Sequence, residues 1–386
     1  MAVLFPFLYQ NMEVSGYYLR KSLVVDIYEG IRMGVEKLKE EGVGIELVTY
    51  DTKGDTATTR KLLSMPEMTS VDLIIGPLVP GPSRLASEFA YHNKINMINP
   101  VSNNSGVMGS NPYAFLLNPS AKTLGRAAGR HAIHGHGLKG KNTIIYYGYR
   151  DTDYNMATEF ANIVKSDSFN IIGMYRVHRD STERIFDYLT AKQYVLDTLG
   201  NQVYVEVEEG EEIADDKKKK LEEYIIAPDS IGSIFVATFD YKIASEVFSS
   251  VANRGDSIQI IGHGSWLLDK TANYKSMQNL GTWMLAADYV NYSGYKYLEF
   301  ESKYIENQHI IPSKYVLAGY DCIMFTGYCL SNFGKYFQNG LKDSVIEDIG
   351  LRRGYDFRNA NDNQYIPLIS FKELRITIMN TDEVEN

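Results

Sequence analysis

Short apolar runs alternate with amphipathic segments along the first half of the chain. Residues 3–8 (VLFPFL) are continuously apolar, which is typical of a strand that is buried on both faces of a sheet. Apolar side chains then recur at helical spacing at Ile27, Ile31, Val35 and Leu38, and the charged residues Lys37, Lys39, Glu40 and Glu41 cover the other side. The pattern predicts a buried strand followed by an amphipathic helix.

The same alternation continues and predicts two successive series of strands and helices. The first series adds strands at 45–50, 72–78 and 95–100, with helices at 56–64 and 82–92. The second has strands at 142–147, 171–177, 231–238 and 258–262, with helices at 121–133, 154–166 and 241–252. Repeated strand–helix–strand units produce parallel sheets with right-handed crossovers. The predicted fold class is therefore α/β, with two doubly wound parallel-sheet lobes.

Composition narrows the classes of function. The 386 residues indicate two or three domains, and the formal charge of −9 argues against a nucleic-acid-binding protein. No apolar run approaches the ~20 residues that cross a bilayer. The only cysteines, Cys322 and Cys329, exclude a disulfide scaffold. We expect both to be small buried side chains of a helix at 315–337.

The start of the chain leaves the cellular compartment open. Met1 is followed at once by an apolar run without a basic segment, so the sequence shows no signal peptide. Two interpretations follow: the protein is cytoplasmic, or a targeting segment has been removed.

Two short motifs near residue 135 depart from the patterns that their chemistry needs. Residues 135–142 (GHGLKGKN) place Asn142 where a phosphate-binding loop has Ser or Thr, and they precede a strand instead of a helix. His131, His134 and His136 cluster without a completing ligand, so no metal site is predicted.

The predicted strands end in loops rich in small, polar and aromatic residues. These loops are 76–83, 100–105, 149–154, 239–241 and 262–266. Because ligands of open α/β sheets bind beyond the carboxyl ends of the strands, the loops predict a binding pocket. Ser83 and Ser102 are explained equally well as helix N-caps. His263 and Ser265 lie close in sequence but lack the glycine pattern of a nucleophile elbow, which makes a hydrolase the weakest alternative.

Several segments, taken in order, resemble the type I periplasmic-binding fold. They are the helix with Tyr28–Gly30, DLIIGPL at 72–78, INMINPVSNNS at 95–105, YAFLLNPS from Tyr113, IQIIGHG at 258–264 and Gly319–Asp321. Together they cover nearly the whole chain. The chain is similar to the leucine/isoleucine/valine-binding proteins and to related receptor ligand-binding regions, and it looks closest to lipoprotein-like members from Bacteroidetes-type bacteria.

The resemblance implies two discontinuous lobes with a ligand in the cleft and closure by a hinge. Lobe 1 would comprise residues 1–118 plus 288–355, and lobe 2 residues 119–287 plus 356–386. Three crossovers would then join the lobes, near Asn118, Ala287 and Phe357.

The resemblance also implies a set of ligand-binding residues. These are Pro80, Gly81 and Ser83 in the first loop, Ser102 and Asn103 in the second, and Asp151, Tyr154, Asp240, Tyr241, His263 and Trp266 in lobe 2. The acid that would pair with a ligand ammonium group is replaced by Gly264, and Asp151, Asp153 or Asp240 would have to substitute for it.

The function implied is capture of a small polar or amphipathic ligand (an amino acid, a peptide or a cell-wall fragment) for ABC-type import or sensing. No catalytic residue, cofactor or metal is expected, and the implied location is the periplasm or cell envelope. The implied partners are a membrane permease or peptidoglycan, with no nucleic acid. The alternatives are a non-catalytic envelope module that contacts peptidoglycan or protein, and a hydrolase.

Overall fold

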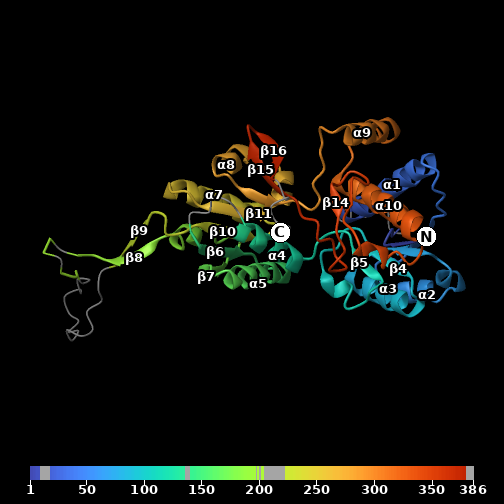
Figure 1. Cartoon of the computed structure of the whole chain (residues 1–386), viewed down its shortest axis with the longest axis horizontal. Helices are drawn as coiled ribbons and strands as arrows, with labels where there is room; N and C mark the ends of the chain where they lie inside the picture. The colour runs from blue at the N-terminus through green and yellow to red at the C-terminus, as the bar shows by residue number, and fades with distance from the viewer. Residues whose placement is uncertain (9–17, 135–139, 197, 200, 204–221, 380–386) are drawn as a thin grey trace. The chain divides into compact units, whose positions relative to one another are not determined.

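The computed structural model describes residues 1–8, 18–134, 140–196, 198–199, 201–203 and 222–379 (Figure 1). They belong to two compact units. Unit 1 comprises Met1–Leu124 and Ala286–Pro367, and unit 2 comprises Gly125–Leu285 and Leu368–Asn386. The chain therefore passes between the units three times, and each unit is built from segments that lie far apart in the sequence.

Unit 1 is built on a five-stranded parallel sheet with the order β2-β1-β3-β4-β5. The strands are β1 (Ala2–Phe5), β2 (Val48–Asp51), β3 (Leu73–Ile75), β4 (Asn96–Asn99) and β5 (Ala114–Leu116). The longer helices are α1 (Tyr18–Glu40), α2 (Thr56–Leu63), α3 (Pro80–Asn93), α9 (Tyr295–Gln308) and α10 (Lys314–Phe333). A short antiparallel pair, β13 (Ile346–Glu347) and β14 (Gly354–Tyr355), completes the unit.

Strand β1 explains why the opening run is apolar throughout. Val3 and Phe5 belong to a core cluster shared with residues of α1 and α10. Ala2 and Leu4 belong to a different cluster, which contains residues of α2 and α3. Successive side chains of a strand point to opposite faces, so a sheet covered by helices on both faces needs apolar residues at every position.

Helices α1 and α10 pack side by side because glycines remove side chains at their contact (Figure 1). A Cβ atom on Gly30 would lie 2.0 Å from the carbonyl oxygen of Val316, and one on Gly319 would lie 1.9 Å from that of Ile27. Both distances are far below van der Waals contact, so only glycine permits this approach of the two backbones.

Unit 2 is built on a seven-stranded sheet with the order β16-β15-β12-β11-β10-β6-β7. The strands are β6 (Asn142–Tyr147), β7 (Asn170–Arg176), β10 (Ser233–Ala237), β11 (Gln259–His263), β12 (Trp283–Leu285), β15 (Leu368–Lys372) and β16 (Arg375–Ile378). The helices are α4 (Ala121–His134), which begins in unit 1, α5 (Asp151–Ser166), α6 (Arg184–Asp187), α7 (Tyr241–Arg254) and α8 (Tyr274–Asn279). A separate pair joins β8 (Ala191–Tyr194) to β9 (Glu222–Ile225).

The predicted fold class is confirmed, with one addition. Strands β7, β6, β10, β11 and β12 are parallel, whereas β15 pairs antiparallel with β12 and with β16. This hairpin near the end of the chain was not predicted. The two cysteines are free and buried, as expected. Within the described residues, no helix combines the length and apolar character needed to cross a membrane.

The described units differ from the predicted division mainly at the first and third connections. The segment from Tyr113, predicted as a crossing, contains β5 at the edge of the unit 1 sheet, and the unit boundary follows Leu124. Residues 356–367, predicted in lobe 2, lie in unit 1. There Asp362 forms a bridge with Leu116 and accepts a hydrogen bond from the backbone N–H of Ser120 at 2.7 Å.

Candidate functional site

In unit 1 the loop between β3 and α3 is held by hydrogen bonds from two buried side chains, Ser83 and Asn99. Pro80 and Gly81 open α3 and are exposed or partly exposed, whereas Ser83 has no exposed surface. The Ser83 hydroxyl donates a hydrogen bond to the carbonyl oxygen of Pro77, and the Asn99 amide donates to the same oxygen at 2.7 Å. Ser83 therefore positions this loop, and its predicted role as a direct ligand contact does not fit its burial.

The loop after β4 presents Ser102 and Asn103, both partly exposed. The side-chain Oδ1 atom of Asn99 accepts hydrogen bonds from the backbone N–H groups of Val101 at 3.1 Å and Ser102 at 2.9 Å. The Ser102 hydroxyl accepts one from Asn104 N–H at 3.2 Å. Because a serine hydroxyl keeps a donor when it accepts, Ser102 can still donate to a ligand.

In unit 2 the strand β6 delivers Asp151 and Tyr154 to the first turn of α5. Asp151 is exposed, and 53% of the Tyr154 side chain is exposed. The Tyr154 ring lies 5.6 Å from that of Tyr147, the last residue of β6. An exposed aromatic ring that is braced by a second ring can serve as a stacking surface for a ligand.

Asp153 occupies the same turn but is buried, with 2% of its surface exposed. Its Oδ2 atom accepts hydrogen bonds from the Arg150 N–H and from the Thr238 hydroxyl, both at 3.4 Å. Its Oδ1 atom has no hydrogen-bond partner in the part of the chain that the structure describes. Burial raises the pKa of this carboxyl group. From the sequence, Asp153 was predicted only as one of three substitutes for the missing acid. Its burial could not be predicted, because it depends on the contact with Thr238 after β10.

Asp240 precedes α7 and is partly buried. Its Oδ1 atom caps the helix by accepting the Lys242 N–H at 3.0 Å, and its Oδ2 atom lies 3.7 Å from Nε of Arg179. The carboxylate is thus partly neutralised within unit 2, which weakens its ability to pair with a ligand cation.

Two aromatic residues predicted to contact ligand belong to the core. Tyr241 is 5% exposed, and its hydroxyl oxygen accepts a hydrogen bond from the Asn273 N–H at 2.7 Å. Trp266 has no exposed surface, and its indole N–H donates to the carbonyl oxygen of Thr238 at 3.0 Å. The predicted ligand contact does not fit either residue, because each ring packs against Phe248 inside the unit.

His263 ends β11 and is 8% exposed. Its Nδ1 atom accepts the backbone N–H of Ser265 at 3.0 Å and lies 2.8 Å from the Ser265 hydroxyl. This is the geometry of a helix cap, because His263 is the N-cap residue of the short helix Gly264–Leu268. The nitrogen that would activate the serine is therefore already used by a backbone group. Gly264, where the family's acid would fall, is buried.

The part of the chain that the structure describes holds no group of three His, Cys, Asp or Glu residues that could bind a metal ion. His136 and residues 135–139 of the loop that resembles a phosphate-binding loop lie outside the described residues.

Comparison with known proteins finds similarity in structure but not in sequence. No protein-family model matches the chain, and no curated protein does. A putative branched-chain amino acid ABC transporter protein from Rhodospirillum rubrum is similar with a TM-score of 0.66 at 13% identity, over 98% of this chain and 99% of that one. An ABC transporter substrate-binding protein from Desulfitobacterium hafniense in complex with Leu gives 0.58 at 15%, over 98% and 99%. A solute-binding protein from R. palustris in complex with benzoate gives 0.55 at 14%, over 98% and 94%.

These matches extend over nearly the full length of both chains, and they confirm the predicted fold. The chain has the fold of the type I periplasmic binding proteins, a class that includes ABC transporter substrate-binding proteins. The further resemblance to Bacteroidetes-type lipoproteins remains a prediction.

Proposed function

We propose that this chain is a solute-binding protein that captures a small polar or amphipathic molecule for import by an ABC transporter. The similar structures cover almost the whole chain and are substrate-binding or solute-binding proteins in their own descriptions. We further propose that it works as a non-catalytic protein in the periplasm and delivers its ligand to a membrane permease. The similar structures offer no support for a peptidoglycan partner.

The observation that carries the proposal is the character of the strand ends in each unit. Ser102 and Asn103 follow β4 in unit 1, and Asp151 and Tyr154 follow β6 in unit 2, all with exposed polar or aromatic surface. Each follows a parallel strand, and the carboxyl ends of such strands form the usual binding edge of the sheet. We propose that these residues, with Pro80, Gly81 and Asp240, contact the ligand.

The charged groups near the proposed site indicate which ligand head groups it can bind. One similar protein is described with leucine and another with benzoate, so this fold accepts an α-amino acid as well as a carboxylate without an ammonium group. Here Gly264 supplies no acid, and Asp240 lies close to Arg179. An isolated ammonium group would be costly to bury under these conditions. Asp151 remains as an exposed carboxylate among the proposed contacts. We therefore expect free amino acids to bind only where their ammonium group reaches Asp151, and neutral polar ligands to bind without that contact.

The test is a thermal-shift panel of amino acids, short peptides, muropeptides and aromatic carboxylates. A ligand at about 100 times its Kd stabilises the folded protein by about 2.7 kcal/mol, which gives a clear rise in melting temperature. Tyr154→Ala should reduce that rise. Tyr91→Ala is the matched control, because the Tyr91 ring is 54% exposed and Tyr154 is 53% exposed. If no compound raises the melting temperature, or if Tyr154→Ala keeps the full rise, the proposal is wrong.

A further inference from the structure

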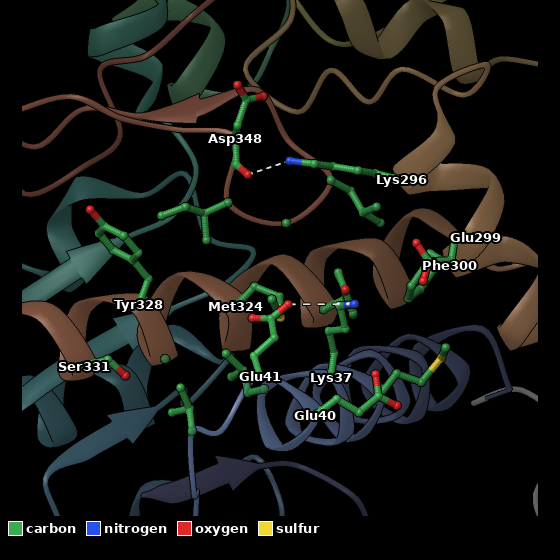
Figure 2. A pocket seen from close by; sticks show the side chains of 18 of the residues that line it. Lys37, Glu40, Glu41, Lys296, Glu299, Phe300, Met324, Tyr328, Ser331 and Asp348 are labelled. Carbon is green, nitrogen blue, oxygen red and sulfur yellow. Dashed lines mark hydrogen bonds and ion pairs between the residues drawn. The ribbon is translucent and has the colours of Figure 1, made fainter.

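Unit 1 contains a cavity of about 600 Å³ that lies away from the strand ends described above (Figure 2). Its walls come from the last turns of α1, from α9 and α10, and from residues 348–351. Helix α1 ends just before the chain returns to the start of β2, at the amino-terminal edge of the sheet. Val43, Gly327 and Ser331 also line a neighbouring hollow that reaches Met1, the residue before β1. The cavity is therefore on the edge of unit 1 opposite to Ser102.

The floor of the cavity is apolar and comes from the core. Leu38, Phe300, Tyr320 and Met324 line it, and each is less than one-tenth exposed. The Phe300 and Tyr320 rings lie 4.6 Å apart, so the floor includes a pair of aromatic rings. Cavities of about 300–1,000 Å³ with apolar walls and a few polar groups are typical of small-molecule sites.

The rim carries charges of both signs, and its three lysines are held by neighbouring oxygens. Figure 2 shows the Lys37 ammonium 3.8 Å from the Glu41 carboxylate, and Lys296 donating to the backbone carbonyl of Asp348 at 2.6 Å. The Lys303 ammonium lies 2.9 Å from the Glu40 carboxylate. Lys296 thus binds the Asp348 backbone, and the Asp348 carboxylate points away from Lys296 (Figure 2). The Glu299 carboxylate, which lines the cavity from α9, forms no hydrogen bond or ion pair among the described residues. Around the cavity, Glu40 and Glu41 are paired with lysines, and the Glu299 carboxylate remains available to a ligand.

Tyr320, on the floor of the cavity, lies near several carboxylates. Burial raises the pKa of its phenol, and the nearby carboxylates of Asp321, Glu41 and Glu299 raise it further. Carboxylates that oppose a negative charge at this point favour a positive one. Aromatic rings also attract cations through their faces, so the Phe300–Tyr320 pair acts in the same direction.

We propose that this cavity is a second binding site, which takes an amphipathic organic cation. The apolar body of the ligand rests on the floor formed by Leu38, Phe300 and Met324. Its ammonium group lies at the rim near Glu299 and Glu41. Such a site is separate from the strand-end site and can be occupied whether or not the first site is filled.

The experiment compares three probes that share one apolar body and differ in charge. They are 4-phenylbutylamine, 4-phenylbutanol and 4-phenylbutyrate, titrated into the full chain by calorimetry. The amine should bind most tightly, the alcohol more weakly and the acid weakest. Glu299→Gln should weaken the amine by about threefold, the effect of one partly exposed charge contact, and leave the alcohol unchanged. Glu306→Gln, an exposed change on the same helix, should leave all three unchanged.

Two further variants locate the binding. Ser331→Trp places a bulky ring at the exposed end of α10 that lines the cavity and should abolish binding of the amine. Ser249→Trp, the same change at an exposed position of α7, should retain it. Equal binding of the three probes, or full binding to Ser331→Trp, would overturn the proposal. Loss of amine binding in Tyr154→Ala would also overturn it, because the cation would then occupy the strand-end site.

Discussion

The carboxyl group of Asp321 lies in the middle of α10, with 1% of its surface exposed. Its Oδ1 atom accepts the backbone N–H groups of Leu351 at 2.6 Å and Arg352 at 3.3 Å, and its Oδ2 atom lies 3.4 Å from Nε of Arg352. Burial nevertheless raises the pKa of Asp321 from 3.8 to about 6, because the loss of hydration outweighs these favourable contacts.

A raised carboxyl pKa makes the folded state bind the proton more tightly than the unfolded state does. The stabilisation is therefore complete below the ordinary pKa of 3.8 and is lost as the pH rises through about 6. Applied to these two values, linkage predicts a loss of about 2 kcal/mol of folding free energy between about pH 4.5 and about pH 7.5. A carboxylate held at low pKa by an exposed ion pair would give the opposite slope.

Asp321→Asn removes this titration and keeps the shape of the side chain. We expect the difference in unfolding free energy between Asp321→Asn and the unchanged protein to shift by about 2 kcal/mol in favour of the variant over that pH range. Urea unfolding should be followed by circular dichroism, because both tryptophans, Trp266 and Trp283, lie in unit 2 and their fluorescence does not report on unit 1. Asp343→Asn, an exposed change in unit 1, is the control.

The reasoning is refuted if the stability of Asp321→Asn relative to the unchanged protein falls, or stays constant, as the pH rises. A constant difference would mean that the contacts with Arg352 and the two N–H groups fully compensate the burial of Asp321. The absolute stability of the variant is a separate matter, because it leaves the Arg352 charge buried with fewer partners, and breaking a buried ion pair costs about 3–5 kcal/mol. The slope against pH isolates the titration from that cost.

Two further changes test packing and loop support. Gly30→Ala should destabilise unit 1 by about 1–3 kcal/mol in urea unfolding, since its Cβ would lie 2.0 Å from the Val316 oxygen, whereas Gly44→Ala, with no atom within 4 Å, should be nearly neutral. Asn99→Ala should lower the free energy of unfolding by about 1–3 kcal/mol, because the backbone N–H groups of Val101 and Ser102 lose their acceptor. The same variant should lower the affinity for any ligand found by thermal shift. Full ligand affinity in Asn99→Ala would show that this loop does not contribute to binding.

The arrangement of strands was predictable because each buried strand has a local signature. Residues 142–147 were predicted as a strand and form β6, since the β-branched and aromatic residues from Thr143 to Tyr147 favour a strand. The hairpin of β15 and β16 was not predictable in the same way. Its antiparallel pairing with β12 joins segments that lie more than eighty residues apart, and no short-range pattern specifies that contact.

The position of the candidate site stays a prediction, and the structure shows only which of its residues are exposed. An aromatic residue just after a strand fits a ligand pocket and a core equally well, and packing decides between them. Tyr154 emerged with half of its ring exposed, whereas Tyr241 and Trp266 were covered by neighbouring elements. Ser83 was predicted either as a ligand contact or as a cap, and its hydroxyl instead holds the Pro77 carbonyl. The sequence shows residue type and spacing but not which face of a loop becomes buried.

The buried residues of unit 2 are important because they hold its strand-end loops together through Thr238. This threonine, 2% exposed, follows β10. Its carbonyl oxygen accepts the Trp266 N–H at 3.0 Å, its hydroxyl donates to Asp153 at 3.4 Å, and the same hydroxyl accepts the Asp240 N–H at 3.2 Å. One side chain and one carbonyl therefore fix the starts of three segments, including the turn that carries Tyr154. Since a supporting layer sets the geometry of contact residues, we expect Trp266 and Asp153 to influence the proposed binding by holding the turn that carries Tyr154.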